Sequence, residues 1–323
     1  MRRTNYLIAS ILSLMTLSNS LCQSQSNEHS KSTPGCVPIN ETLLCDVTEI
    51  TNFSWLEYQF WTKKAFGEDS EEYKNTIISQ DVWSMLACGD SLKADYLKHP
   101  AYRNFPLVGV TQEQAKNYSQ WRSDRVFEYH LIKDGEIEFL NNQPIGQHFT
   151  IEKYFKGEFF ARIGDSSNFE DKRIVPNMDR MYPDYRLPTQ DERILILDYI
   201  DSTDFIYHEK RAKEYKNWRN NNLPFHLAIA PCDDSLAFYP TRSVDNVPFK
   251  KNKFQLIRDS RGNVAEWSAA KDTTYGGGWS HNVEYVMKND VIYSETANPW
   301  TGFRNVCSWK NWNATATTES YIH

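Results

Sequence analysis

The chain has 323 residues, 40% of them hydrophobic and 14% aromatic, so it can bury a large core. Its formal net charge of −6 provides no basic field to attract phosphate backbones, which excludes nucleic acid as an expected partner.

The start of the chain has the layout of a secretory signal peptide. Two arginines precede an apolar run from Tyr6 to Leu17, and polar residues follow. The run is too short to be a good membrane span. We therefore expect a signal peptide over residues 1–20, a polar tether over 21–38, and export to the periplasm, the outer membrane or the cell surface.

Cysteine usage agrees with an oxidising compartment but leaves several questions open. The six cysteines are Cys22, Cys36, Cys45, Cys88, Cys232 and Cys307. Cys22 is the candidate for a lipid anchor, although Leu21 stands where the lipidation signal needs a small residue, so both an anchored and a free form stay open. Cys36 and Cys45 are the nearest pair for a disulfide, but the sequence does not determine connectivity. No pair has zinc-site spacing, so we interpret the cysteines as structural.

Three helices are predicted from capping boxes, in which a Ser or Thr and a Glu or Gln three residues later satisfy each other's backbone amides. The pairs are Ser54 with Glu57, Thr111 with Gln114, and Thr189 with Glu192. Apolar residues recur at helical spacing after each pair, and Gly67 is expected to end the first helix.

Regular signals are weaker elsewhere. Asp134-Gly135 between apolar runs predicts a hairpin over 130–138, and short strand-like pieces occur at 227–230 and 285–287. No linker-like stretch divides the chain, so we expect one domain over 39–312, followed by a tail over 313–323. The fold class is mixed α+β, with few helices, short strands and much ordered loop.

Six local signatures follow one another along the chain. They are Val47–Asn52, Phe105–Val110, Tyr185–Thr189, Gly262–Trp267, Gly276–Trp279 and Thr301–Arg304. In this order they resemble the formylglycine-generating enzyme (sulfatase-modifying factor) family. The resemblance implies a C-type-lectin-like fold. It also implies that the charged residues of the signatures, Glu49, Arg186, Glu266 and Arg304, form a buried framework of paired charges.

The chemistry of the family is not retained. Members that make formylglycine carry two copper-binding cysteines in the stretch that corresponds here to Gly276–Arg304, and this stretch has none. A copper-dependent oxidase needs such thiolates because soft ligands select Cu(I). Gly278 also replaces the family's small hydroxyl residue. We therefore expect a pseudoenzyme with no catalytic or cofactor-binding residues and no copper.

Two other features of the resemblance concern binding. The asparagine of the Gly-Asn-Val motif helps to hold a structural calcium in the resembling enzymes, and Asn263 matches it; the alternative is an asparagine that accepts backbone hydrogen bonds in a tight turn. Trp279, Ser280 and His281 lie in the loop that lines the family's cleft. For His281 the alternative is an ordinary loop histidine.

The stretch from His99 to Ser123 is similar to one subgroup, the gliding-motility and type IX secretion lipoproteins of Bacteroidetes, which keep the fold without the catalytic cysteines. Our first hypothesis is therefore an exported, non-catalytic module that binds envelope proteins or a secretion or motility complex. It would contact the membrane only through a lipid on Cys22. An enzyme of altered, metal-dependent oxidation chemistry and a carbohydrate- or peptide-binding lectin-like module remain alternatives.

Overall fold

The computed structural model describes residues 33–86, 89–139, 143–165, 168–203, 241, 243, 257–281, 286 and 290–313. Several predictions lie outside these residues: the signal peptide, most of the tether, Cys22, Cys88, Cys232, the strand-like pieces at 227–230 and 285–287 except residue 286, and nearly all of the tail. Residues 35–323 form one compact unit and residues 1–34 another. The first of these units is described here.

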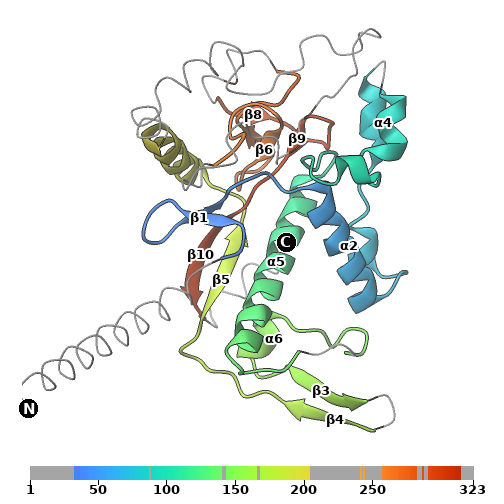
Figure 1. The fold of residues 1–323 in the computed structure, drawn as a ribbon, viewed down its shortest axis with the longest axis vertical. Coiled ribbons are helices and arrows are strands. Elements are labelled where there is room, and N and C mark those ends of the chain that lie inside the picture. The colour runs from blue at the N-terminus through green and yellow to red at the C-terminus, as the bar shows by residue number, and fades with distance from the viewer. Residues whose placement is uncertain are drawn as a thin grey trace, which may run out of the picture. The chain divides into compact units, whose positions relative to one another are not determined.

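The unit is mixed α+β with few long helices and short strands, as predicted (Figure 1). Its helical elements are α2 (Asn52–Phe66), α3 (Glu71–Lys74), η1 (Gln80–Met85), α4 (Asp90–Asp95), η2 (Pro100–Tyr102), α5 (Gln112–Lys133) and α6 (Ile151–Phe155), and residues 190–203 are also helical. Its strands are β1 (Cys36–Pro38), β2 (Leu44–Asp46), β3 (Phe160–Asp165), β4 (Asn168–Arg173), β5 (Met181–Arg186), β6 (Ala265–Trp267), β7 (Thr273–Tyr275), β8 (Ile292–Tyr293), β9 (Thr301–Gly302) and β10 (Val306–Asn311).

The first four-stranded sheet is antiparallel and has the order β1-β2-β10-β5. β10, the last strand among the described residues, therefore lies between β2 and β5, which come from much earlier in the chain. Val306 pairs with Cys45 on one side and with Arg186 on the other. This arrangement ties both ends of the domain into one sheet.

Side chains alternate between the two faces of this sheet along each strand. A helix packs against each face. On one face α5 runs alongside β5 (Figure 1), and Ser123 Oγ accepts a 2.8 Å hydrogen bond from the backbone of Tyr185. On the other face, Ile196 and Ile200 of the 190–203 helix pack in one apolar cluster with Cys45 of β2 and Val306 of β10.

The second four-stranded sheet has the order β8-β7-β6-β9, and β6 and β9 pair in parallel. Gly302 in β9 lies where a Cβ atom would come within 2.4 Å of the carbonyl oxygen of Leu107. Only glycine allows this close approach of backbones, which joins the Thr301–Arg304 signature to the Phe105–Val110 signature.

Five of the six sequence signatures meet in one buried apolar cluster. Each contributes at least one member, and these are Ile50, Leu107, Val110, Leu187, Trp267 and Phe303. Aromatic side chains from α2 and α5 complete the cluster: the rings of Trp55 and Tyr118 are stacked with centroids 5.7 Å apart. The signatures are therefore dispersed in sequence but form one core.

Two of the three predicted helix starts are confirmed. Thr111 caps α5 with both hydrogen bonds of the capping box. At the start of the helix over residues 190–203, the amides of Thr189 and Glu192 each donate to the other residue's side chain. The start predicted at Ser54 is wrong, because Thr51 is the cap and its side chain accepts from the Ser54 amide. Gly67 ends α2 as predicted, with φ of 96°.

The hairpin predicted over 130–138 is also wrong. Helix α5 continues to Lys133, Asp134 is its C-cap, and Gly135 follows with φ of 74°. A glycine with positive φ suits a helix C-terminus as well as a tight hairpin turn. Burial decides between the two, since Phe127 and Leu131 are both 0% exposed on one helix face.

None of the described cysteines forms a disulfide. Cys36 pairs with Asp46 in the β1–β2 hairpin while Cys45 pairs with Val37, so the two cysteines lie on opposite faces of the hairpin and do not form the pair that their spacing suggested. Burial raises the pKa of both Cys45 and Cys307 to about 12. Both thiols are core side chains.

We expect stability to depend on pH through Asp124, a nearly buried residue of α5 whose Oδ1 accepts a 2.9 Å hydrogen bond from the Ile151 amide. Burial raises the pKa of Asp124 from its ordinary value of 3.8 to about 7, against the opposing effect of that hydrogen bond. The folded state then holds this proton more tightly than the unfolded chain. The stabilisation is complete below about pH 4 and is lost as the pH rises through about 7.

Asp124→Asn keeps the acceptor without the titration, so its stability relative to the parent protein should rise between about pH 4 and pH 7. Urea unfolding at several pH values measures this difference. The exposed Asp69→Asn is the control and should show no such trend. A difference between Asp124→Asn and the parent that does not vary with pH would contradict the expectation.

Candidate functional site

A cluster of buried charges connects two signatures, Gly262–Trp267 and Thr301–Arg304. Glu266 is 2% exposed, and its two carboxylate oxygens accept from Arg304 Nε at 2.6 Å and from Arg193 Nη1 at 3.1 Å. Arg304 also donates to the carbonyl oxygens of Asp46, at 3.0 Å, and of Arg258, at 2.6 Å. Burial disfavours charge on Arg304, but Glu266, Cys45 and Glu49 together outweigh this effect and raise the pKa of Arg304. This cluster holds strands together and has no surface exposed for a substrate.

The framework predicted from the signatures is confirmed for Glu266 and Arg304, which are nearly fully buried and paired. Glu49 is buried as predicted, but among the described residues its side chain accepts from an asparagine amide and not from a basic residue. The prediction is wrong for Arg186, whose side chain is 31% exposed and pairs with Glu192 near the surface.

Arg193, which is 1% exposed, is the member that sequence reasoning missed. It also donates to the carbonyl oxygen of Ser260. A signal was present in the sequence: Arg193 lies three residues before Ile196 and seven before Ile200, which places it on the buried face of its helix.

Asn263 lies beside this cluster in a left-handed conformation, with φ of 56°. Its Nδ2 donates to Glu49 Oε1 at 3.0 Å, and its backbone carbonyl accepts from the Trp279 amide at 2.8 Å. Glu49 Oε2 is buried and has no hydrogen-bond partner among the residues that the structure describes. Burial, with a further contribution from Asp259, raises the pKa of Glu49 well above its ordinary value.

The side chains of these residues are already engaged with one another. Calcium takes six to eight oxygen ligands, whereas Asn263 directs an N–H group at the neighbouring carboxylate and Glu266 is saturated by two guanidinium groups. Within the described parts of the chain, no group of three or more His, Cys, Asp or Glu side chains could hold a metal ion. Calcium at Asn263 stays a prediction that the geometry of this cluster does not favour.

The three residues expected in a cleft share one short turn but differ in exposure. Trp279 is 1% exposed and its indole N–H donates to the Pro299 carbonyl at 3.0 Å, whereas Ser280 is exposed. His281 is half-buried, and its Nδ1 accepts a 2.8 Å hydrogen bond from the amide of Gly278. Burial lowers the pKa of His281, which favours the neutral ring that can accept this bond. His281 therefore closes its own loop, and its role in a cleft stays a prediction.

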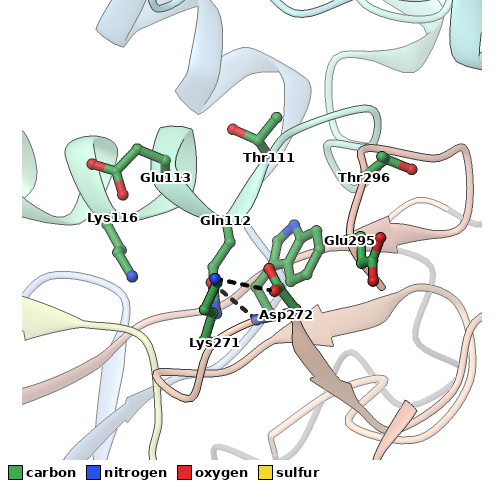
Figure 2. A pocket seen from close by; sticks show the side chains of 9 residues that line it. Thr111, Gln112, Glu113, Lys116, Lys271, Asp272, Glu295 and Thr296 are labelled. Carbon is green, nitrogen blue, oxygen red and sulfur yellow. Dashed lines mark hydrogen bonds and ion pairs between the residues drawn. The ribbon is translucent and has the colours of Figure 1, made fainter. Parts of the chain in front are cut away.

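A pocket of about 340 Å³ opens between three other segments (Figure 2). The start of α5, the turn between β6 and β7, and the loop before β9 line it. The lining residues are Thr111, Gln112, Glu113, Lys116, Trp267, Lys271, Asp272, Glu295 and Thr296. Sequence reasoning missed this site because its residues come from three segments that are distant in the sequence.

Gln112 fixes the wall of this pocket. Its Nε2 donates to the carbonyl oxygens of Ser268 and Ala270 at 2.7 and 2.6 Å, and its Oε1 accepts from the Asp272 amide at 3.3 Å. All three bonds join the first turn of α5 to the β6–β7 turn. Trp267 lies behind them, with its indole N–H bound to the Val110 carbonyl at 2.9 Å.

Comparisons with known proteins bear on the family. A family model for the sulfatase-modifying factor enzyme 1-like domain matches residues 38–309. Among solved structures, the chain is similar to the crystal structure of CarF, with 17% identity, a TM-score of 0.37 and coverage of 82% of this chain and 86% of that one. It is also similar to Treponema denticola variable protein 1, with 14% identity, a TM-score of 0.34 and coverage of 82% and 84%. No curated protein matches the chain.

The fold and the buried charge cluster define a mixed α+β module in which dispersed signatures build one core. The family match spans most of this module, and the chain belongs to the sulfatase-modifying factor enzyme 1-like (FGE-sulfatase) family. The resemblance found in the sequence is confirmed at this level. Among the residues that the structure describes, no helix has the length and apolar character needed to cross a membrane.

Proposed function

We propose that this protein is an exported, non-catalytic member of its family that acts as a structural or protein-binding component of the bacterial cell envelope. The observation that carries the proposal is the absence of cysteine from Gly276 to Arg304, where formylglycine-forming members carry their thiolates. Cys307 lies just beyond this stretch and does not substitute for them. It is 0% exposed in β10, and burial raises its pKa to about 12, so it is neither accessible nor ionised near neutral pH.

The finer part of the proposal places the protein in gliding motility or type IX secretion. It rests on the similarity of the His99–Ser123 stretch to the lipoproteins of those systems. A lipid on Cys22 would then be the membrane contact, and envelope proteins would be the partners.

The test uses the full-length protein purified from the envelope fraction of its host. We expect no aldehyde in a cysteine-containing sulfatase-type peptide after aerobic incubation with Cu(I), and no stoichiometric copper or iron by elemental analysis. We also expect chemical crosslinking in intact cells to recover the protein in one reproducible envelope complex. Aldehyde formation or a stoichiometric redox metal would overturn the non-catalytic part, and recovery only as an uncrosslinked monomer would overturn the envelope part.

A further inference from the structure

We propose that the pocket at the start of α5 binds a peptide segment of a partner protein that carries one basic and one acidic side chain. The inference deepens the proposed function and rests on it, since it supplies the site where a protein-binding module would hold its partner. At about 340 Å³, the pocket falls within the size range of sites that bind small ligands.

The pocket is held in shape by hydrogen bonds among all three of its walls. Besides the three bonds of Gln112, the Ser294 amide donates to the Asp272 carbonyl at 2.9 Å, which joins the loop before β9 to the β6–β7 turn. Asn298 Nδ2 holds that loop through Ser294 Oγ at 2.9 Å and the Thr296 carbonyl at 3.2 Å. The Gly109 amide, just before α5, donates to the Asn298 carbonyl at 3.0 Å. A site fixed in this way loses little conformational entropy when a ligand binds.

Charged side chains of both signs line the pocket, and their charges are available to a ligand. Within the parts of the chain that the structure describes, Glu113, Lys116 and Glu295 form no ion pair and no side-chain hydrogen bond. Lys271 and Asp272 approach only to 3.9 Å, and the Lys271 side chain is 90% exposed. A weak, exposed contact of this kind contributes little.

The mixture of signs selects the class of ligand. Two ammonium groups and three carboxylates line one pocket, so a ligand of a single charge meets repulsion as well as attraction. A segment with one basic and one acidic side chain can pair with both. Figure 2 shows Glu113 and Lys116 on α5, and Glu295 and Thr296 on the loop before β9. The hydroxyls of Thr111 and Thr296 can bond the peptide backbone.

The experiment measures binding of three capped hexapeptides to the full mature protein by isothermal titration calorimetry at low salt. One peptide carries a lysine and a glutamate, one carries two lysines, and one carries two glutamates. We expect the mixed peptide to bind about tenfold more tightly than either other, since each exposed ion pair contributes a factor of a few.

Variants then test the site. Lys116→Glu should weaken the mixed peptide severalfold and strengthen the two-lysine peptide. Lys133→Glu, an exposed lysine at the far end of the same helix, should change neither. Equal affinity for all three peptides, no binding, or the same response to Lys116→Glu and Lys133→Glu would overturn the assignment.

Crosslinking of both variants in cells separates this inference from the proposed function. Loss of the envelope complex in Lys116→Glu, but not in Lys133→Glu, supports the pocket. Survival of the complex in both variants overturns the pocket and leaves the proposed function standing. Peptide selectivity without any envelope complex supports the pocket and overturns the proposed function.

Discussion

Glu266→Ala should destabilise the protein by about 3–5 kcal/mol, because it leaves two buried guanidinium groups without their carboxylate. Arg193 and Arg304 each use a separate oxygen of Glu266, and both arginines are almost completely buried. Neither can turn to water without opening the core. Urea or thermal unfolding, followed by circular dichroism, measures the loss.

Glu68→Ala is the matched control for this change. Glu68 also pairs with a basic side chain, Lys63, at 2.7 Å, but its side chain is 68% exposed. Its loss should cost less than about 1 kcal/mol. Equal losses for Glu266→Ala and Glu68→Ala would contradict the view that the central cluster is a buried strut.

Trp55→Ala should destabilise the protein by about 3–5 kcal/mol, because it leaves a cavity in the centre of the core in which the signatures meet. Trp55 is 0% exposed, stacks on Tyr118, and packs edge-on against Tyr58 and Phe303. Its indole N–H also donates to the Thr76 carbonyl at 3.0 Å. The midpoint of chemical unfolding gives the measurement.

Two further variants of α2 separate packing from other effects. Trp55→Phe retains most of the packing and should cost less than half as much as Trp55→Ala, since Gln59 Nε2 still donates to the Thr76 carbonyl at 2.7 Å. Phe60→Ala, at a position 72% exposed, should change stability by less than about 0.5 kcal/mol. A loss at Phe60 comparable to that at Trp55 would contradict this account of the core.

Much of the local helical structure could be predicted because its causes are local. The capping box at Thr111 and the pair at Thr189 and Glu192 are complete within four residues, and the structure contains both. Helix α2 begins about one turn before the predicted start, since Thr51 and Ser54 can both act as caps and only tertiary contacts select Thr51. Asn52 Nδ2 donates to the Tyr96 and Tyr102 carbonyls, which fixes the earlier start.

The sheets could not be predicted in the same way. Their strands have two to six residues, too short for a period of two to be distinguished from chance, and their partners are distant in sequence. The resemblance to a family supplied the fold class where periodicity could not. Apolar signature residues such as Ile50 and Phe303 were recognisable as motif members, but the core that they share depends on tertiary contacts.

For the candidate site, the paired charges at Glu266 and Arg304 could be predicted, Arg193 could be found only from its helical face, and the pocket could not be predicted. An arginine near the start of a helix that is rich in charged residues is normally interpreted as solvent-exposed. Its burial becomes evident only when its position on the helix is compared with that of Ile196. The pocket forms only where the first turn of α5 meets two loops that lie more than 150 positions further along the chain, as in the contact between Gln112 and Ser268. No single polar residue in the sequence indicates that these segments come together.

The position of β10 in the first sheet determines when folding can be completed. A chain made from its N-terminus has β1 and β2 available early and β5 later, but β2 and β5 are both neighbours of β10 and not of each other. The sheet therefore stays divided into two incomplete parts, each with an open edge, until residues 306–311 have emerged. Such non-local pairing slows folding and leaves unfinished chains exposed to aggregation. Completion of this sheet is thus a late event that awaits the synthesis of β10.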